Sequence, residues 1–79
     1  MWVRTQDKKQ MLQVNSFSIT RNYGAKLKFA LMGTTATSSL FGSQTTILGF
    51  YTAEPDAIQE LDHIQNYLQG GHEGVYQVG

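Results

Sequence analysis

The chain has 79 residues, 41 % of them hydrophobic, and six basic and six acidic residues give it a formal net charge of zero. A chain of this length forms a single domain over residues 1–79 and buries only about 60 % of its unfolded surface, so we expect a homo-oligomer. The absence of cysteine excludes disulfides and thiolate chemistry, and two histidines are too few for a closed zinc site.

Alternating side chains predict four strands in the first 52 residues. Residues 2–6 form the first strand, and residues 11–20 form the second, with a change of phase at Asn15 that predicts a bulge or bend. A turn at 21–24 precedes the third strand, residues 26–33, which is hydrophobic on one face and basic near the start of the other. The fourth strand begins near Thr45 and ends near Thr52.

The segment that follows carries the clearest helix signal. Thr52 is the expected N-cap, Pro55 is tolerated in the first turn, and Gly70 with Gly71 ends the helix. The predicted apolar stripe consists of Ala57, Leu61, Ile64 and Leu68, with Ile58 beside it. The predicted solvent-facing side consists of Asp56, Gln59, Glu60, His63 and Asn66.

A short final strand at residues 75–78 completes the order β-β-β-β-α-β. We therefore predict an α+β fold: a curved antiparallel sheet of four to five strands with one C-terminal amphipathic helix packed on it. No internal repeat, linker or low-complexity tract interrupts this order.

The charges are separated along the chain. Every Lys and Arg lies in the first 28 residues, and every acid except Asp7 lies after residue 50. This pattern predicts a basic face and an acidic helix, which either attract an anionic ligand, pair subunits, or form two ordinary solvated surfaces. The balanced total argues against duplex nucleic acid as a partner. No apolar run approaches the roughly 18 residues of a membrane span and no signal peptide is evident, so we expect a cytoplasmic protein with no membrane partner.

The sequence gives little support for catalytic residues. His63 and His72 are the only candidate bases, and no nucleophile motif accompanies them. Asp56 and Glu60 have the ordinary spacing of surface carboxylates on a helix. Neither phosphate-binding glycine fingerprint is present, so we predict a non-enzymatic protein with no catalytic residue, no metal and no cofactor.

The hydroxyl-rich stretch from Gly33 to Gln44 is the main candidate for binding, because it is longer than a hairpin connection needs. Lysine and arginine side chains together with serine and threonine hydroxyls bind phosphate, and aromatic rings stack on nucleobases. The predicted ligand-binding residues are Trp2, Arg4, Lys26, Lys28, Thr34, Thr35, Phe41 and Ser43. In the alternative interpretation, the stretch is a long connection between strands with no role in binding, and Trp2 belongs to the hydrophobic core.

Three motifs resemble a family of small uncharacterised proteins of Gram-positive bacteria and their phages. They are RTQDK near the start, LGFY before the helix, and LDHIQ within it, matching R-[ST]-Q-[DN]-K, L-G-x-Y and L-D-x-I-Q. The family has no established catalytic residues, so the resemblance transfers none. It implies an intracellular protein associated with phages or other mobile elements, a class whose small members often act stoichiometrically against host defence.

We therefore predict a small binding protein that sequesters an anionic nucleotide-like ligand, as an anti-defence sponge for a nucleotide signal would. The alternative is a protein-interaction module that inhibits or scaffolds a host protein. That module would use Leu40, Phe41 and the acidic helix face.

Overall fold

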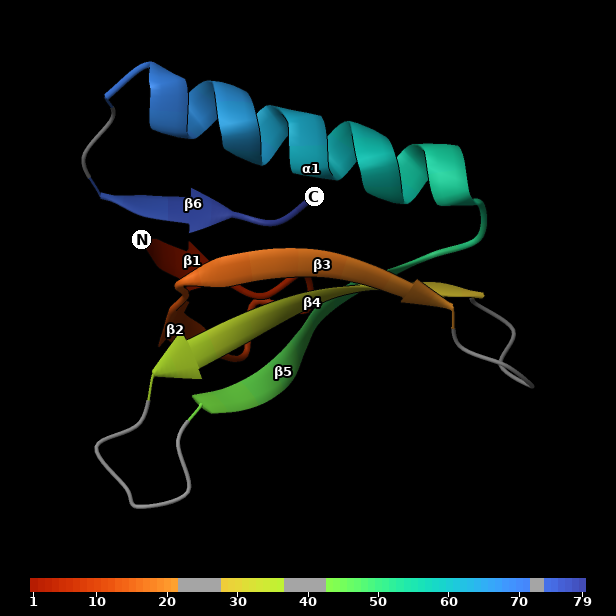
Figure 1. The fold of residues 1–79 in the computed structure, drawn as a ribbon, viewed down its shortest axis with the longest axis horizontal. Coiled ribbons are helices and arrows are strands. Elements are labelled where there is room, and N and C mark those ends of the chain that lie inside the picture. Colours follow the sequence, from red (N-terminus) through yellow and green to blue (C-terminus); the bar gives the residue numbers. More distant parts are fainter. Residues whose placement is uncertain (22–27, 37–42, 72–73) are drawn as a thin grey trace.

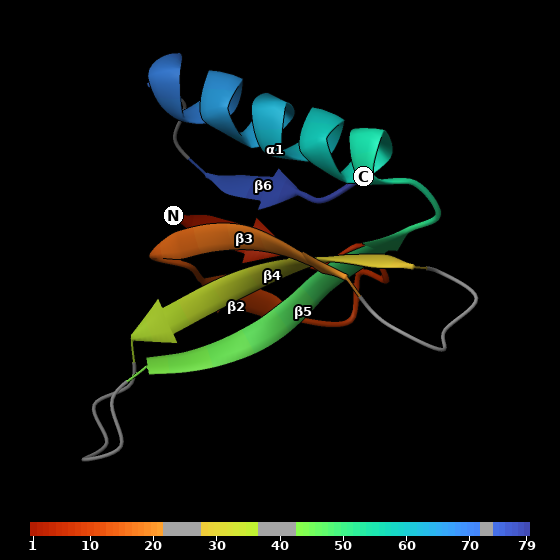
Figure 2. The ribbon, with the colours of Figure 1, turned by 45° about the vertical axis from the view of Figure 1, so that its right-hand side comes forward.

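Six strands and one helix make up the described part of the computed structural model, which comprises residues 1–21, 28–36, 43–71 and 74–79. They are β1 (Trp2–Arg4), β2 (Met11–Gln13), β3 (Ser16–Arg21), β4 (Phe29–Ala36), β5 (Ser43–Tyr51), α1 (Glu54–Gln69) and β6 (Val75–Gln77). The strands form two three-stranded sheets, in the orders β2-β1-β6 and β3-β4-β5 (Figure 1). Figures 1 and 2 show α1 lying along the side of the molecule that carries β6 and β3.

The predicted α+β class is confirmed, but the prediction of one antiparallel sheet is wrong. The strands are divided between two sheets, and β6 runs parallel to β1, with Val3 opposite Tyr76. This parallel pairing is possible because the long connection through the rest of the chain returns β6 in the same direction as β1. The predicted second strand is also divided, since β2 pairs with β1 while β3 pairs with β4. The phase change at Asn15 is therefore the point where the chain passes from one sheet to the other.

Side chains from both sheets and the helix meet in one core. Its buried members are Val3, Val14, Leu31, Leu48, Ile64 and Val78, none more than 2 % exposed. Gly33 of β4 lies against this core, where a Cβ atom would come within 2.9 Å of Leu48 Cδ1 and 3.1 Å of Val14 Cγ1. A side chain at this position would therefore press on Leu48 of the neighbouring strand β5 and on Val14, which lies between β2 and β3.

The helix begins one residue later than predicted. Ala53, not Thr52, is the N-cap; its backbone is extended and its side chain makes no capping hydrogen bond. Pro55 occupies the first turn as predicted. At the other end the Gly70 N–H donates to the Asn66 carbonyl, and Gly71 has a φ of 66°, a conformation that glycine adopts without strain.

The buried face of α1 differs from the predicted stripe. Ala57 and Ile64 are buried as expected, whereas Ile58 is 42 % exposed and Leu68 is 53 % exposed. The prediction that Glu60 faces solvent is wrong, because its side chain is only 6 % exposed. The residues of β6 and those after it lie against this side of the helix and give the carboxylate its hydrogen-bond donors.

Candidate functional site

A pocket opens between the N-terminal half of α1 and the neighbouring ends of β3 and β4. Its cavity volume is about 410 Å³, which lies within the range of about 300–1,000 Å³ typical of small-molecule sites. Its lining residues are Ile19, Arg21, Phe29, Glu54, Ile58 and Leu61. Four of these six are apolar, and the two others carry opposite charges.

Strand pairing builds the sheet wall of the pocket. Arg21 at the end of β3 lies directly opposite Phe29 at the start of β4, and Ile19 lies opposite Leu31. Directly opposed residues of an antiparallel pair project from the same face of the sheet. The Arg21 guanidinium and the Phe29 ring therefore flank the same end of the cavity. Lys28, which immediately precedes Phe29, is exposed beside them.

The helix supplies the other wall. Glu54 lies in the first turn, Ile58 follows one turn later, and Leu61 follows after a further three residues, so all three share one side of the helix. The pocket accounts for the exposure of Ile58, because this side chain borders the open cavity. Leu61, in contrast, is half-buried against the core.

The chemistry of this pocket suits a ligand with a flat apolar body and a charged end. An aromatic face such as that of Phe29 stacks on planar rings. A guanidinium binds a phosphate or carboxylate through two parallel hydrogen bonds, and the Glu54 carboxylate accepts hydrogen bonds from hydroxyl or amino groups. Arg21 already interacts within the protein, so a bound anion would share or replace that contact.

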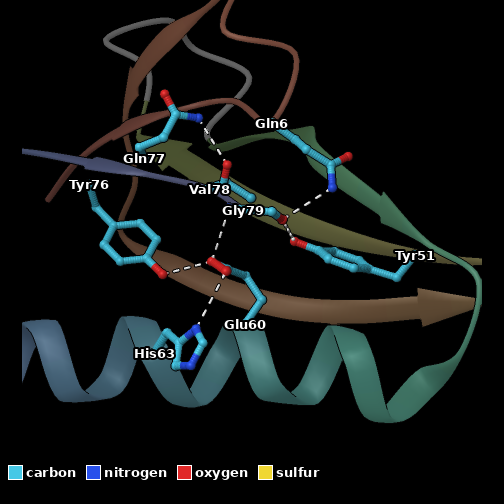
Figure 3. A network of polar contacts seen from close by, with 8 residues as sticks. All are labelled: Gln6, Tyr51, Glu60, His63, Tyr76, Gln77, Val78 and Gly79. Atoms are coloured by element: carbon cyan, nitrogen blue, oxygen red, sulfur yellow. Dashed lines mark hydrogen bonds and ion pairs between the residues drawn. The ribbon is translucent and has the colours of Figure 1, made fainter.

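A second polar cluster joins α1 to the last residues of the chain (Figure 3). Glu60 Oε2 accepts hydrogen bonds from the Tyr76 hydroxyl at 2.7 Å and from the Gly79 backbone N–H at 3.2 Å. His63 Nδ1 lies 3.8 Å from Glu60 Oε1. The Gly79 carbonyl oxygen in turn accepts a hydrogen bond of 2.7 Å from the Tyr51 hydroxyl.

Both tyrosines of this cluster hold their protons more strongly than usual. Burial and the nearby Glu60 carboxylate raise the pKa of Tyr51 to about 12. Burial, followed by the hydrogen bond to Glu60, also raises the pKa of Tyr76. In the part of the chain that the structure describes, no buried side-chain nitrogen or oxygen lacks a hydrogen-bond partner. The cluster therefore anchors the chain after β6 to the helix.

The strand positions of the residues predicted to bind a ligand through hydroxyl groups are far from the pocket. Thr34 and Thr35 are near the end of β4, and Ser43 begins β5. Lys28 precedes the opposite end of β4, about 20 Å away at roughly 3.4 Å per residue. The Thr35 hydroxyl donates to the Gln44 carbonyl at 3.2 Å, so a bond across the hairpin already uses its proton.

The other predicted site residues are also dispersed. Trp2 and Arg4 lie on β1 in the other sheet, and the Arg4 Nε donates to the Lys8 carbonyl at 3.1 Å. Trp2 is 48 % exposed, so the alternative that it belongs to the core is wrong. Lys26 and Phe41 lie outside the described residues, as do Leu40 and His72. Of the predicted residues that the structure describes, none lines the pocket, and Lys28 adjoins the lining residue Phe29 in the chain.

The sequence analysis missed Arg21 and Glu54 as members of one site. Each is an ordinary charged residue at the end of a strand or the start of a helix, and only the folded arrangement brings them together. No three His, Asp or Glu side chains among the described residues are grouped so that they could hold a metal ion. None of the described helical residues forms a segment long and apolar enough to cross a membrane.

No family model matches this chain, and no match is found among the curated proteins or the solved structures. The resemblance to small proteins of Gram-positive bacteria and their phages therefore stays a hypothesis. The function is inferred from the pocket and its surroundings.

Proposed function

We propose that this protein is a non-enzymatic binding protein that holds a small anionic, nucleotide-like ligand in the pocket between β3, β4 and α1. The observation that supports this proposal is the pairing of Arg21 with Phe29 at one end of an apolar cavity of about 410 Å³. A cation beside an aromatic face matches a ligand in which a phosphate adjoins a planar base.

Four of the six lining residues have a defined part in this proposal. The base stacks on Phe29 and is covered from the helix side by Ile58. Arg21 binds the phosphate, and the exposed Lys28 adds positive charge at the rim. Glu54 accepts hydrogen bonds from the ribose hydroxyls, the role that carboxylates have in many nucleotide sites.

The proposed role is stoichiometric sequestration. The one buried carboxylate identified in the described part of the chain, Glu60, is bonded to Tyr76 and Gly79 and does not line this pocket. The motif resemblance to phage-associated proteins agrees with a protein that lowers the free concentration of a nucleotide signal in a bacterial cell. Such a function needs binding and no turnover.

Isothermal titration calorimetry against a panel of linear and cyclic nucleotides tests this proposal. Arg21→Gln keeps the side chain long and polar but removes its charge, and should weaken binding about tenfold or more, since a charge-assisted hydrogen bond contributes about 1.5–3 kcal/mol. Phe29→Leu retains an apolar wall and should weaken binding by removing the stacking surface.

Lys9→Gln is the matched control, because Lys9 is an exposed cation in the turn between β1 and β2 and does not line the pocket. It should bind like the unchanged protein. Absence of heat from every nucleotide at high micromolar concentration, or equal losses in Arg21→Gln and Lys9→Gln, would contradict the proposal. A mass spectrum of small molecules released by heating the purified protein would identify a bound ligand directly.

A further inference from the structure

The free edge of β5 has the properties of a pairing surface. β5 spans nine residues, is the longest described strand, and lies at the edge of its sheet. Its sequence, SQTTILGFY, contains no charged residue and no proline, two of the usual protections of an exposed edge, and the register shift in its pairing with β4 comes only after Ile47. Among the other described edge strands, β2 and β6 have three residues each, and β3 ends in Arg21. Figures 1 and 2 both show β5 at the outer margin of its sheet.

Gln6 already covers the second half of this edge. Its backbone N–H donates to the Leu48 carbonyl at 2.8 Å. Its side-chain amide accepts a hydrogen bond from the Phe50 N–H at 2.9 Å and donates one to the Phe50 carbonyl at 3.2 Å. This reciprocal pair reproduces the bonds that a neighbouring antiparallel strand makes. The part of the edge that remains available therefore ends at Ile47.

In the first half of β5, the backbone N–H and carbonyl groups of Thr45 and Ile47 point away from β4, toward the free edge. Thr34 of β4 lies opposite Thr45, and its carbonyl accepts a hydrogen bond from Asn15, on the side away from β5. Thr34 and Thr45 therefore form a pair that exchanges no hydrogen bonds, and the alternation of the ladder gives Met32 and Ile47 the same geometry. Within the described residues, β5 pairs only with β4, and Ile47 is 42 % exposed.

We propose that two copies of the chain associate through antiparallel pairing of residues 43–47 of β5, centred on Thr45. In this register Thr45 lies opposite its own counterpart, and Ile47 lies opposite Ser43. Each opposed pair exchanges both backbone bonds, which gives about six hydrogen bonds across the contact. The two β3-β4-β5 sheets then form one continuous sheet.

Two observations favour a second copy of the chain as the partner and Thr45 as the centre of the pairing. In a two-fold contact, residues 43–47 of one copy pair with residues 43–47 of the other. A charged side chain in this segment would therefore lie close to its own like-charged counterpart, and the segment contains no charged residue. A register centred on Ile47 would bring Thr45 of one copy opposite Gly49 of the other, where Gln6 already occupies the edge. Thr45 is the centre that uses the available edge without displacing Gln6.

Sedimentation velocity at high micromolar concentration tests the association, with Ile47→Lys as the disrupting variant. The matched control is Ser18→Lys, because Ser18 is exposed on β3 and lies in the same cross-strand row through Met32, at the opposite edge of the sheet. The unchanged protein and Ser18→Lys should be dimers, and Ile47→Lys should be a monomer with an unchanged circular dichroism spectrum. A monomeric unchanged protein, or equal behaviour of the two lysine variants, would overturn the proposal.

A cysteine variant tests the register, because the natural chain contains no cysteine. Opposed residues in such a pair have Cα atoms about 5.5 Å apart, within the range of disulfides. Thr45→Cys should therefore form a disulfide-linked dimer under mild oxidation. Thr20→Cys, exposed on β3, should remain mostly uncross-linked under the same conditions. Equal cross-linking of both variants would refute a contact centred on Thr45.

Discussion

Replacement of Tyr76 by phenylalanine tests whether the Glu60 cluster anchors β6 to the helix. The variant keeps the ring and removes a hydroxyl that donates to Glu60 Oε2 at 2.7 Å. The carboxylate is only 6 % exposed, and within the protein its Oε2 keeps only the hydrogen bond from the Gly79 N–H at 3.2 Å. Removing a hydrogen bond to a charged group costs about 1.5–3 kcal/mol.

Urea unfolding followed by circular dichroism measures this loss in the free energy of unfolding. A loss of about 2 kcal/mol corresponds to a fall in Tm of about 8–16 °C for a domain of this size. Tyr51→Phe is the comparison, since the Tyr51 hydroxyl donates to an exposed Gly79 carbonyl and its loss should cost about 1 kcal/mol or less. If Tyr76→Phe unfolds within about 0.5 kcal/mol of the unchanged protein, Glu60 is not a buried anchor and the reasoning fails.

Three further predictions concern stability and the β5 edge. Gly33→Ala should destabilise the fold by about 1–3 kcal/mol in urea unfolding, because its methyl group would lie 2.9 Å from Leu48 Cδ1 and 3.1 Å from Val14 Cγ1; an unchanged midpoint would show that these two side chains can move aside. The pKa of Tyr51 and Tyr76 is above its ordinary value in the folded protein, so the unfolded chain loses these protons first and stability should fall as the pH rises from 10 to about 12. Unfolding at several alkaline pH values checks this, and a Tyr51→Phe chain with an equally steep fall would contradict the contribution of Tyr51. Gln6→Ala removes the side-chain amide that covers the N–H and carbonyl of Phe50, so light scattering should show assemblies larger than those of the unchanged protein, and an unaltered size would refute the covering role of the Gln6 side chain.

Local patterns in the sequence predicted most of the elements and little of their arrangement. Alternation predicted that β4 and β5 exist, and apolar spacing predicted α1, because these signals depend on residues close together in the chain. The predicted bounds of the strands were wrong: β4 ends at Ala36 instead of Gly33 and β5 begins at Ser43 instead of Thr45, so part of the predicted connection at residues 33–44 belongs to the two strands. Glu60 was misplaced because its helix position, considered alone, belongs to the polar side. Its burial depends on Tyr76 and Gly79, which the β1–β6 pairing brings against the helix.

The candidate site shows the same limit. Lys28 was predicted from its charge; it precedes the pocket residue Phe29 in the chain but does not line the pocket itself. Arg21 was not selected, since its position opposite Phe29 depends on the strand register, which the sequence of the turn between them did not reveal. Glu54 was not selected either, because it lies on α1, far from Arg21 in the sequence. Pocket residues of this kind become visible only when packing is known.

The most direct test of the proposed function is a titration of isotope-labelled protein with a nucleoside monophosphate, followed by backbone amide chemical shifts. Binding in the proposed pocket predicts the largest shifts at Ile19, Arg21, Phe29 and Ile58, which lie on its two walls. Shifts confined to the region around Thr34, Thr35 and Ser43, or no shifts at any nucleotide concentration, would contradict the account.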